Sequence, residues 1–160
     1  MSEKRIVILS KSERETFELG KNLGTLFKKE GRALVCLFGD LGAGKTVFVK
    51  GIAEALGLEG REVGSASFIL GAEYKTKNEG GKELLFHHID LYRIANIEEE
   101  EWIWDYLEKG ITAIEWAEKL GKVPEDAIKV YIKIKEKDER EISIEGLDKI
   151  YWDNIQKRKA

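Results

Sequence analysis

The feature that most constrains this chain is a glycine-rich segment, GDLGAGKT, at positions 39–46. It fits the phosphate-binding pattern G-x-x-x-x-G-K-[ST]. A continuous apolar run, ALVCLF, stands directly before it at 33–38, and the residues from 45 to 57 have helical spacing, with Gly57 as the expected stop. A buried strand, a glycine-rich loop and a helix in this order favour a phosphate-binding unit over a chance glycine-rich turn.

Each residue type in this loop has a chemical reason to be there. Glycine lets the backbone approach a phosphate without a clash from Cβ, so successive N–H groups can surround the anionic oxygens. Lys45 is expected to reach the β and γ oxygens of a nucleotide, and the Thr46 hydroxyl to coordinate magnesium. The predicted nucleotide contacts in the loop are Gly39, Asp40, Leu41, Gly42, Ala43, Gly44, Lys45, Thr46 and Val47.

Two carboxylates end apolar runs further along the chain. Asp90 closes LLFHHID, where it could hold a phosphate-bound magnesium, although a lone aspartate there could also cap the following turn. Glu115 closes ITAIE, where it could orient or deprotonate an attacking water, but a surface glutamate at a strand-to-helix junction fits the position equally well. The adjacent His87 and His88 predict no shared metal site, because neighbouring residues of a strand point to opposite faces.

The pattern of elements predicts an α/β fold of one domain, residues 1–160, with a P-loop NTPase-like three-layer architecture. Alternating strands and helices imply a mostly parallel central sheet, to which hairpins add antiparallel strands. The predicted strands cover 5–10, 33–38, 67–77, 82–90, 111–116, 127–137 and 140–146. The predicted helices cover 12–31, 45–57, 97–109, 117–121 and 147–159.

Charge and composition exclude some functions. The formal net charge is −3, so no global positive field attracts RNA or an anionic membrane, and any RNA contact must be local or made through a partner. The single cysteine, Cys36, allows no internal disulfide. No apolar run approaches the length that spans a membrane, and the protein is expected in the cytoplasm without membrane attachment.

Missing sequence elements narrow the choice of nucleotide and of reaction. The N-K-x-D element that reads guanine does not occur, so ATP is expected. A nucleotide kinase needs an acceptor site and usually an arginine-bearing lid, whereas the seven arginines here are scattered. Two alternatives to an ATPase stay open: a small P-loop kinase acting on a small-molecule acceptor, and a nucleotide-gated binding module that does not hydrolyse its ligand.

Several motifs together resemble one family. The strings FGDLGAGKTVFVKGIAEALG, VGSASFIL, FHHIDLYRI and IEWAEKL follow the order and spacing of the bacterial TsaE (YjeE) family. The resemblance implies an ATPase using ATP/ADP and Mg²⁺. It also implies that this ATPase joins the TsaD and TsaB proteins in making threonylcarbamoyladenosine (t6A) in tRNAs that read ANN codons, with tRNA engaged through the complex.

The same resemblance implies roles for individual residues. It makes Asp90 the Walker B carboxylate, Lys45 and Glu115 catalytic residues beside it, and Glu115 with Trp116 the family's "EW" pair, Trp116 contacting the nucleotide. The family's switch-like segment usually reads S-P-T and here reads S-A-S at 65–67, so Ser67 keeps the hydroxyl while the missing proline frees the backbone. The implied magnesium ligands are Thr46, Ser67, Asp90 and Glu115.

Overall fold

The computed structural model describes residues 5–59, 63, 71–94, 103, 105 and 109–147. Within these ranges the predicted strands and helices are present, with bounds that differ by a few residues at most. The strands are β1 (Ile6–Ser10), β2 (Ala33–Phe38), β3 (Gly71–Lys77), β4 (Glu83–Asp90), β5 (Ile111–Glu115), β6 (Ile128–Ile134) and β7 (Arg140–Glu145). The helices are α1 (Glu13–Glu30), α2 (Lys45–Ala55) and the 3-10 turn η2 (Ala117–Leu120).

The seven described strands form one mixed sheet in the order β1-β7-β6-β2-β5-β4-β3. The four central strands, β6, β2, β5 and β4, run parallel, whereas the pairings β1–β7, β7–β6 and β4–β3 are antiparallel. The expected mostly parallel sheet is therefore confirmed for its centre only. Each hairpin adds an antiparallel strand to one side of that centre, and β1 extends the sheet in the same way.

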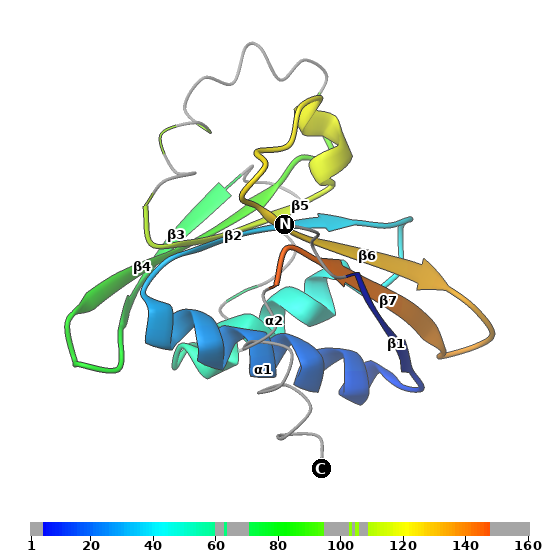
Figure 1. Ribbon diagram of the computed structural model, residues 1–160, viewed down its shortest axis with the longest axis horizontal. Helices are drawn as coiled ribbons and strands as arrows, with labels where there is room; N and C mark the ends of the chain where they lie inside the picture. The colour runs from blue at the N-terminus through cyan, green and yellow to red at the C-terminus, as the bar shows by residue number, and fades with distance from the viewer. Residues whose placement is uncertain are drawn as a thin grey trace.

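Helices α1 and α2 lie together on one face of the sheet, below it in Figure 1. The two helices approach closely through glycines: a Cβ on Gly20 would lie 2.1 Å from the Phe48 carbonyl oxygen, and one on Gly51 would lie 2.1 Å from the Phe17 carbonyl oxygen. This close contact fixes α2, and therefore the loop before it, against the longer α1.

The opposite face carries a second, smaller apolar cluster, which includes Cys36, Ile114, Leu120 and Ile103. Among the described elements, η2 lies over this face, above the sheet in Figure 1. The predicted helices 97–109 and 147–159 and the start of the predicted strand 67–77 lie largely outside the described residues. No helix in the described part of the chain is long and apolar enough to cross a membrane.

The ends of α1 are stabilised by hydrogen bonds to residues close in sequence. The Ser12 side chain accepts a hydrogen bond from the Glu15 backbone N–H at 3.1 Å, and the Glu15 carboxylate accepts one from the Lys11 N–H at 3.2 Å. Gly31 ends the helix with φ 79°, and its N–H donates to the Phe27 carbonyl. Both ends are therefore satisfied by neighbours in sequence, which is why local patterns locate this helix well.

Candidate nucleotide-binding site

The glycine-rich loop connects β2 to α2, as its flanking sequence predicts. Gly39 has φ 154°, and a Cβ there would lie 2.6 Å from the Ile132 carbonyl oxygen, so only glycine fits. Gly44, with φ 115°, stands at the N-cap of α2, where no side chain caps the helix and the first turn holds no acidic residue. The free N–H groups and the positive end of the helix dipole therefore attract an anion at this point.

Lys45 curls back over this loop. Its ammonium donates to the backbone carbonyls of Gly39 and of Asp40, the latter at 3.0 Å, and lies 3.9 Å from the centre of the Trp116 ring. Burial lowers the pKa of Lys45, and the nearby negative charge of Glu118 opposes that shift. The cation is thus positioned at the loop by contacts that phosphate oxygens can replace.

Glu115 is a buried carboxylate at the same place. It ends β5, is 2% exposed, and its Oε1 accepts a hydrogen bond from the Thr46 hydroxyl at 2.8 Å. Its Oε2 lies 2.5 Å from Nε2 of His88, which is 1% exposed. The alternative of a surface glutamate is wrong for Glu115, because the carboxylate is enclosed and contacts the first turn of α2.

Asp90 lies beside Glu115, because the two are register partners on β4 and β5. Its Oδ1 accepts the Tyr92 N–H at 2.9 Å, so it does cap the turn after β4. It is also buried, and this burial raises the pKa of its carboxyl, with the Tyr92 N–H acting in the opposite direction and the Glu115 charge adding to the rise. The cap engages one oxygen, which leaves the other to serve the site.

The oxygen donors gathered here suit a hard cation. The Thr46 hydroxyl and the carboxylates of Asp90 and Glu115 are ligand types that Mg²⁺ prefers. The described residues contain no cluster of three or more His, Cys, Asp or Glu side chains that could hold a metal ion. Few protein ligands are typical of Mg²⁺ bound together with nucleotide phosphates, which supply the rest of its coordination.

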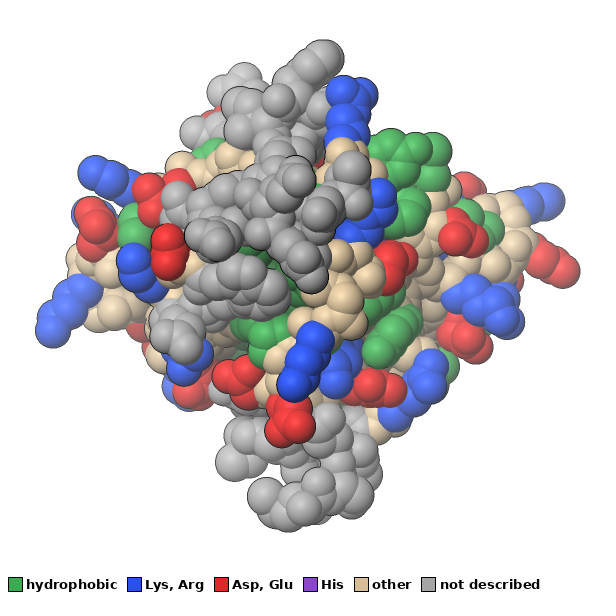
Figure 2. All heavy atoms as spheres, turned by 90° about the horizontal axis from the view of Figure 1, so that it is seen from above, with side chains coloured by type: hydrophobic (Ala, Val, Ile, Leu, Met, Phe, Trp, Pro, Cys, Tyr) green, Lys and Arg blue, Asp and Glu red, His purple; other side chains and the backbone are tan. Residues whose placement is uncertain are grey.

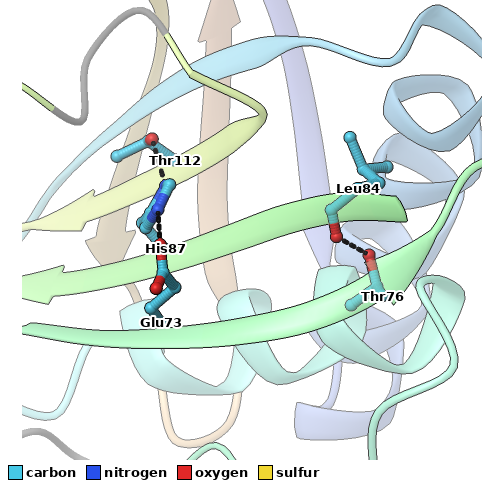
Figure 3. A network of polar contacts seen from close by, with 5 residues as sticks. All are labelled: Glu73, Thr76, Leu84, His87 and Thr112. Atoms are coloured by element: carbon cyan, nitrogen blue, oxygen red, sulfur yellow. Dashed lines mark hydrogen bonds and ion pairs between the residues drawn. The ribbon is translucent and has the colours of Figure 1, made fainter. Parts of the chain in front are cut away.

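The two adjacent histidines point to opposite faces of the sheet, as predicted. His87 lies between Glu73 on β3 and Thr112 on β5, with its Nε2 2.9 Å from the Glu73 Oε1 and its Nδ1 3.4 Å from the Thr112 hydroxyl (Figure 3). His88 instead faces the Glu115 carboxylate on the side of α2. Neither is a surface residue, and no histidine is visible on the face drawn in Figure 2.

Arg140 contacts the glycine-rich loop, and the sequence alone does not reveal this contact. Its Nε donates to the Ala43 carbonyl at 2.9 Å and its Nη2 to the Gly42 carbonyl at 3.3 Å, while Nη1 donates to the carbonyls of Lys137 and Glu139 in its own hairpin. The guanidinium thus joins the β6–β7 turn to the glycine-rich loop. Nothing in the local pattern signals this contact, because 97 residues separate Arg140 from Ala43.

A surface hollow of about 370 Å³, including its open mouth, lies beside the loop. It is lined by residues from the loop, from the start of α1 and from the β6–β7 hairpin. These residues are Glu13, Thr16, Gly42, Ala43, Gly44, Val47, Asp138 and Arg140.

Of the other sequence predictions, Trp116 lies against Lys45 and Tyr92, in the left-handed conformation at φ 58°. Ser67 falls outside the described residues and stays a prediction.

The fold and the loop together define the class of protein: an α/β protein with a phosphate-binding loop between a central parallel strand and its helix. A family model described as "Threonylcarbamoyl adenosine biosynthesis protein TsaE" matches residues 10–142. The chain therefore belongs to the TsaE family.

Individual relatives agree with this assignment. A protein of Aquifex aeolicus named tRNA threonylcarbamoyladenosine biosynthesis protein TsaE is 40% identical over 113 residues, which cover 70% of this chain and 77% of that protein. A Bacillus subtilis protein of the same name is 37% identical over 139 residues, covering 86% and 83%. The crystal structure of Bacillus subtilis YdiB is similar throughout, with a TM-score of 0.72, 26% identity, and coverage of 100% of this chain and 99% of that one.

Proposed function

We propose that this protein binds and hydrolyses ATP with Mg²⁺, and that it does so as a subunit acting with TsaD and TsaB in making threonylcarbamoyladenosine in tRNA. One observation carries the ATPase part: the buried Glu115 carboxylate is hydrogen-bonded to the Thr46 hydroxyl at the N-terminus of α2. A module that only binds nucleotide has no need for a buried carboxylate at that position. The names of the relatives support the pathway part.

The loop residues would perform the binding. The N–H groups at the start of α2 would take the β-phosphate, and Lys45 would exchange the carbonyls of Gly39 and Asp40 for β and γ oxygens. Thr46 and Asp90 would hold the magnesium ion, which neutralises charge on the phosphates when bound. The hollow beside the loop, with Val47 and Thr16 in its lining, offers room for the nucleoside.

Glu115 would act on the attacking water. The water oxygen forms a bond to the γ-phosphorus, the bond from that phosphorus to the bridging oxygen breaks, and ADP leaves with the bridging oxygen. Glu115 orients the water and accepts its proton, which later passes to the phosphate product. The carboxylate can do this because both its oxygens are held at fixed positions.

The rate of ATP hydrolysis would depend on the partner proteins, because few positive groups in the described part of the chain would be available near the γ-phosphate. The transition state for phosphoryl transfer gains from an extra positive group near the γ-phosphate. Arg140, which lies beside the loop, already donates to four backbone carbonyls. Catalysis would therefore be slow until TsaD and TsaB supply a cation near the γ-phosphate, and tRNA would be reached through that complex.

The deciding experiment measures ATP turnover by the protein alone, with TsaD and TsaB, and with tRNA added. Slow turnover alone and faster turnover in the assembly are expected. Glu115→Ala should keep nucleotide binding, but its stimulated turnover rate should fall by about 100-fold or more. Lys45→Ala should lose both nucleotide binding and stimulated turnover. Lys50→Ala, on the same helix as Lys45, is the matched control.

Each alternative function predicts a different result. A small phosphoacceptor that accelerates ATP loss, with its phosphorylated product recovered, would support the kinase instead. Tight nucleotide binding without turnover under any of the three conditions would support the gated binding module. Turnover by the isolated protein that is fast and indifferent to TsaD and TsaB would refute the proposed partnership.

A further inference from the structure

His88 is a buried histidine that contacts the proposed water-activating carboxylate. It lies on β4 opposite Ala113 of β5, two positions before the Asp90–Glu115 pair, and its side chain points to the same face as Glu115. From there its Nε2 reaches the Glu115 Oε2 at 2.5 Å. An ionised carboxylate can only accept hydrogen bonds. Nε2 of His88 therefore carries the ring proton and donates a hydrogen bond to Glu115.

The other ring nitrogen of His88 is not used in the same way. Its Nδ1 is buried and has no hydrogen-bond partner within the described part of the chain. The adjacent His87 is the natural comparison, because both of its ring nitrogens have partners, Glu73 and Thr112 (Figure 3). A buried imidazole with only one of its two nitrogens hydrogen-bonded calls for a reason other than packing. The hydrogen bond that His88 does make, to Glu115, indicates that this reason lies in the carboxylate.

The proposed reaction requires the Glu115 carboxylate to be held in one orientation. In the structure two donors hold Glu115, the Thr46 hydroxyl on Oε1 and His88 on Oε2. A Thr46 hydroxyl that coordinated magnesium through an oxygen lone pair would keep its O–H, so Oε1 could retain this donor on one lone pair and turn its other lone pair toward water. His88 holds the other oxygen, Oε2, and so restrains a long side chain that would otherwise rotate.

We propose that His88 is a positioning residue for Glu115: its Nε2–H holds Oε2 and so directs Oε1 at the attacking water. The inference rests on the proposed ATPase function and deepens it. It assigns His88 no contact with nucleotide or metal, and its effect passes entirely through the carboxylate. A role in packing alone would not depend on which atom of the side chain donates the hydrogen bond.

That difference allows a matched pair of variants. In His88→Gln the amide nitrogen stands as many bonds from Cα as Nε2 does, so it can still donate to Glu115. In His88→Asn the amide nitrogen stands where Nδ1 does and cannot reach. Both changes place a neutral amide in the same buried site, so a structural role predicts similar losses for both. His87→Gln controls for loss of an imidazole from this strand.

Turnover is measured with TsaD and TsaB, and fluorescent-ADP affinity is measured with and without Mg²⁺. We expect His88→Asn to lower the stimulated kcat about 30-fold, within the range for groups that orient a reacting ligand, while magnesium-free ADP affinity stays within about twofold. His88→Gln should keep at least about a third of the wild-type kcat, and His87→Gln nearly all of it. In a Glu115→Ala background, His88→Asn should cause no further loss.

A second readout needs no turnover. In the nucleotide-free protein the ring ¹⁵N shifts of His88 should place its proton on Nε2, and a proton on Nδ1 alone would overturn the inference. Equal losses in the Asn and Gln variants, with the wild type active, overturn this inference and leave the ATPase function standing. A wild type without turnover in the full assembly overturns the proposed function and this inference with it.

Discussion

Replacing Arg140 by alanine tests whether a residue remote in sequence orders the phosphate-binding loop. Arg140 donates to the loop carbonyls of Ala43 at 2.9 Å and Gly42 at 3.3 Å. A hydrogen bond from a charged donor contributes about 1.5–3 kcal/mol, and the longer, exposed bond contributes less. We therefore expect Arg140→Ala to lower the free energy of unfolding by about 2 kcal/mol.

The loop should also lose part of its preorganisation. If about 1.4 kcal/mol of that loss falls on the binding-competent loop, ADP affinity drops about tenfold. Arg140→Lys should fall between wild type and alanine, since an ammonium cannot serve two carbonyls as a planar fork does. Arg14→Ala, which removes an exposed pair with Glu18 and an exposed contact over the Phe17 ring, should change the free energy of unfolding by about 1 kcal/mol or less.

Denaturant titration gives the stability and fluorescent-ADP titration gives the affinity. Pyrophosphate competition separates the two ways in which Arg140 could act, because Arg140 also lines the hollow beside the loop. Loop ordering requires pyrophosphate affinity to fall with ADP affinity. If Arg140→Ala loses stability yet binds ADP and pyrophosphate as the wild type does, the guanidinium only ties the hairpin together and the reasoning is refuted.

Three further predictions concern other parts of the chain. Asp90→Asn should weaken ADP binding more with Mg²⁺ than without it, whereas equal effects in the two titrations would leave Asp90 a turn cap. Gly20→Ala should destabilise by about 2 kcal/mol or more in denaturant titration, despite the better helix propensity of alanine, because the new Cβ meets the Phe48 carbonyl oxygen. Burial raises the pKa of the Cys36 thiol from 9.0 to about 12. Unfolding should therefore become easier as pH rises from 9.0 towards 12, and at pH 8 a thiol reagent should label only unfolded chains.

Local patterns were enough to predict the loop and the strand ends. The run at 33–38 is apolar throughout because β2 is the central strand and has neighbours on both sides and core on both faces. The spacing of Gly39, Lys45 and Thr46 places their groups at one helix N-terminus wherever the rest of the chain goes. Asp90 and Glu115 meet because parallel strands bring their carboxyl ends to the same edge.

The contacts that the sequence could not predict are those that cross between elements. The Arg140 contact depends on the register of the β6–β7 hairpin and on where that hairpin joins the sheet. The His88–Glu115 contact depends on the β4–β5 register, and both sequence and spacing are silent on it. The share of parallel pairings is lower than predicted, because the two hairpins and the long-range β1–β7 pairing make three of the six strand pairings antiparallel.

The charged groups of the candidate site are paired with one another before any ligand arrives. Lys45 is held by loop carbonyls and an aromatic ring, and Glu115 by a hydroxyl and an imidazole. Binding must break some of these contacts, so a ligand with few oxygens gains little from the exchange. A polyphosphate with magnesium replaces several contacts at once, through the loop N–H groups, the Lys45 ammonium and the Thr46 hydroxyl. In the proposed function, the same pairing that stabilises the free site would therefore favour a polyphosphate with magnesium over a simple anion.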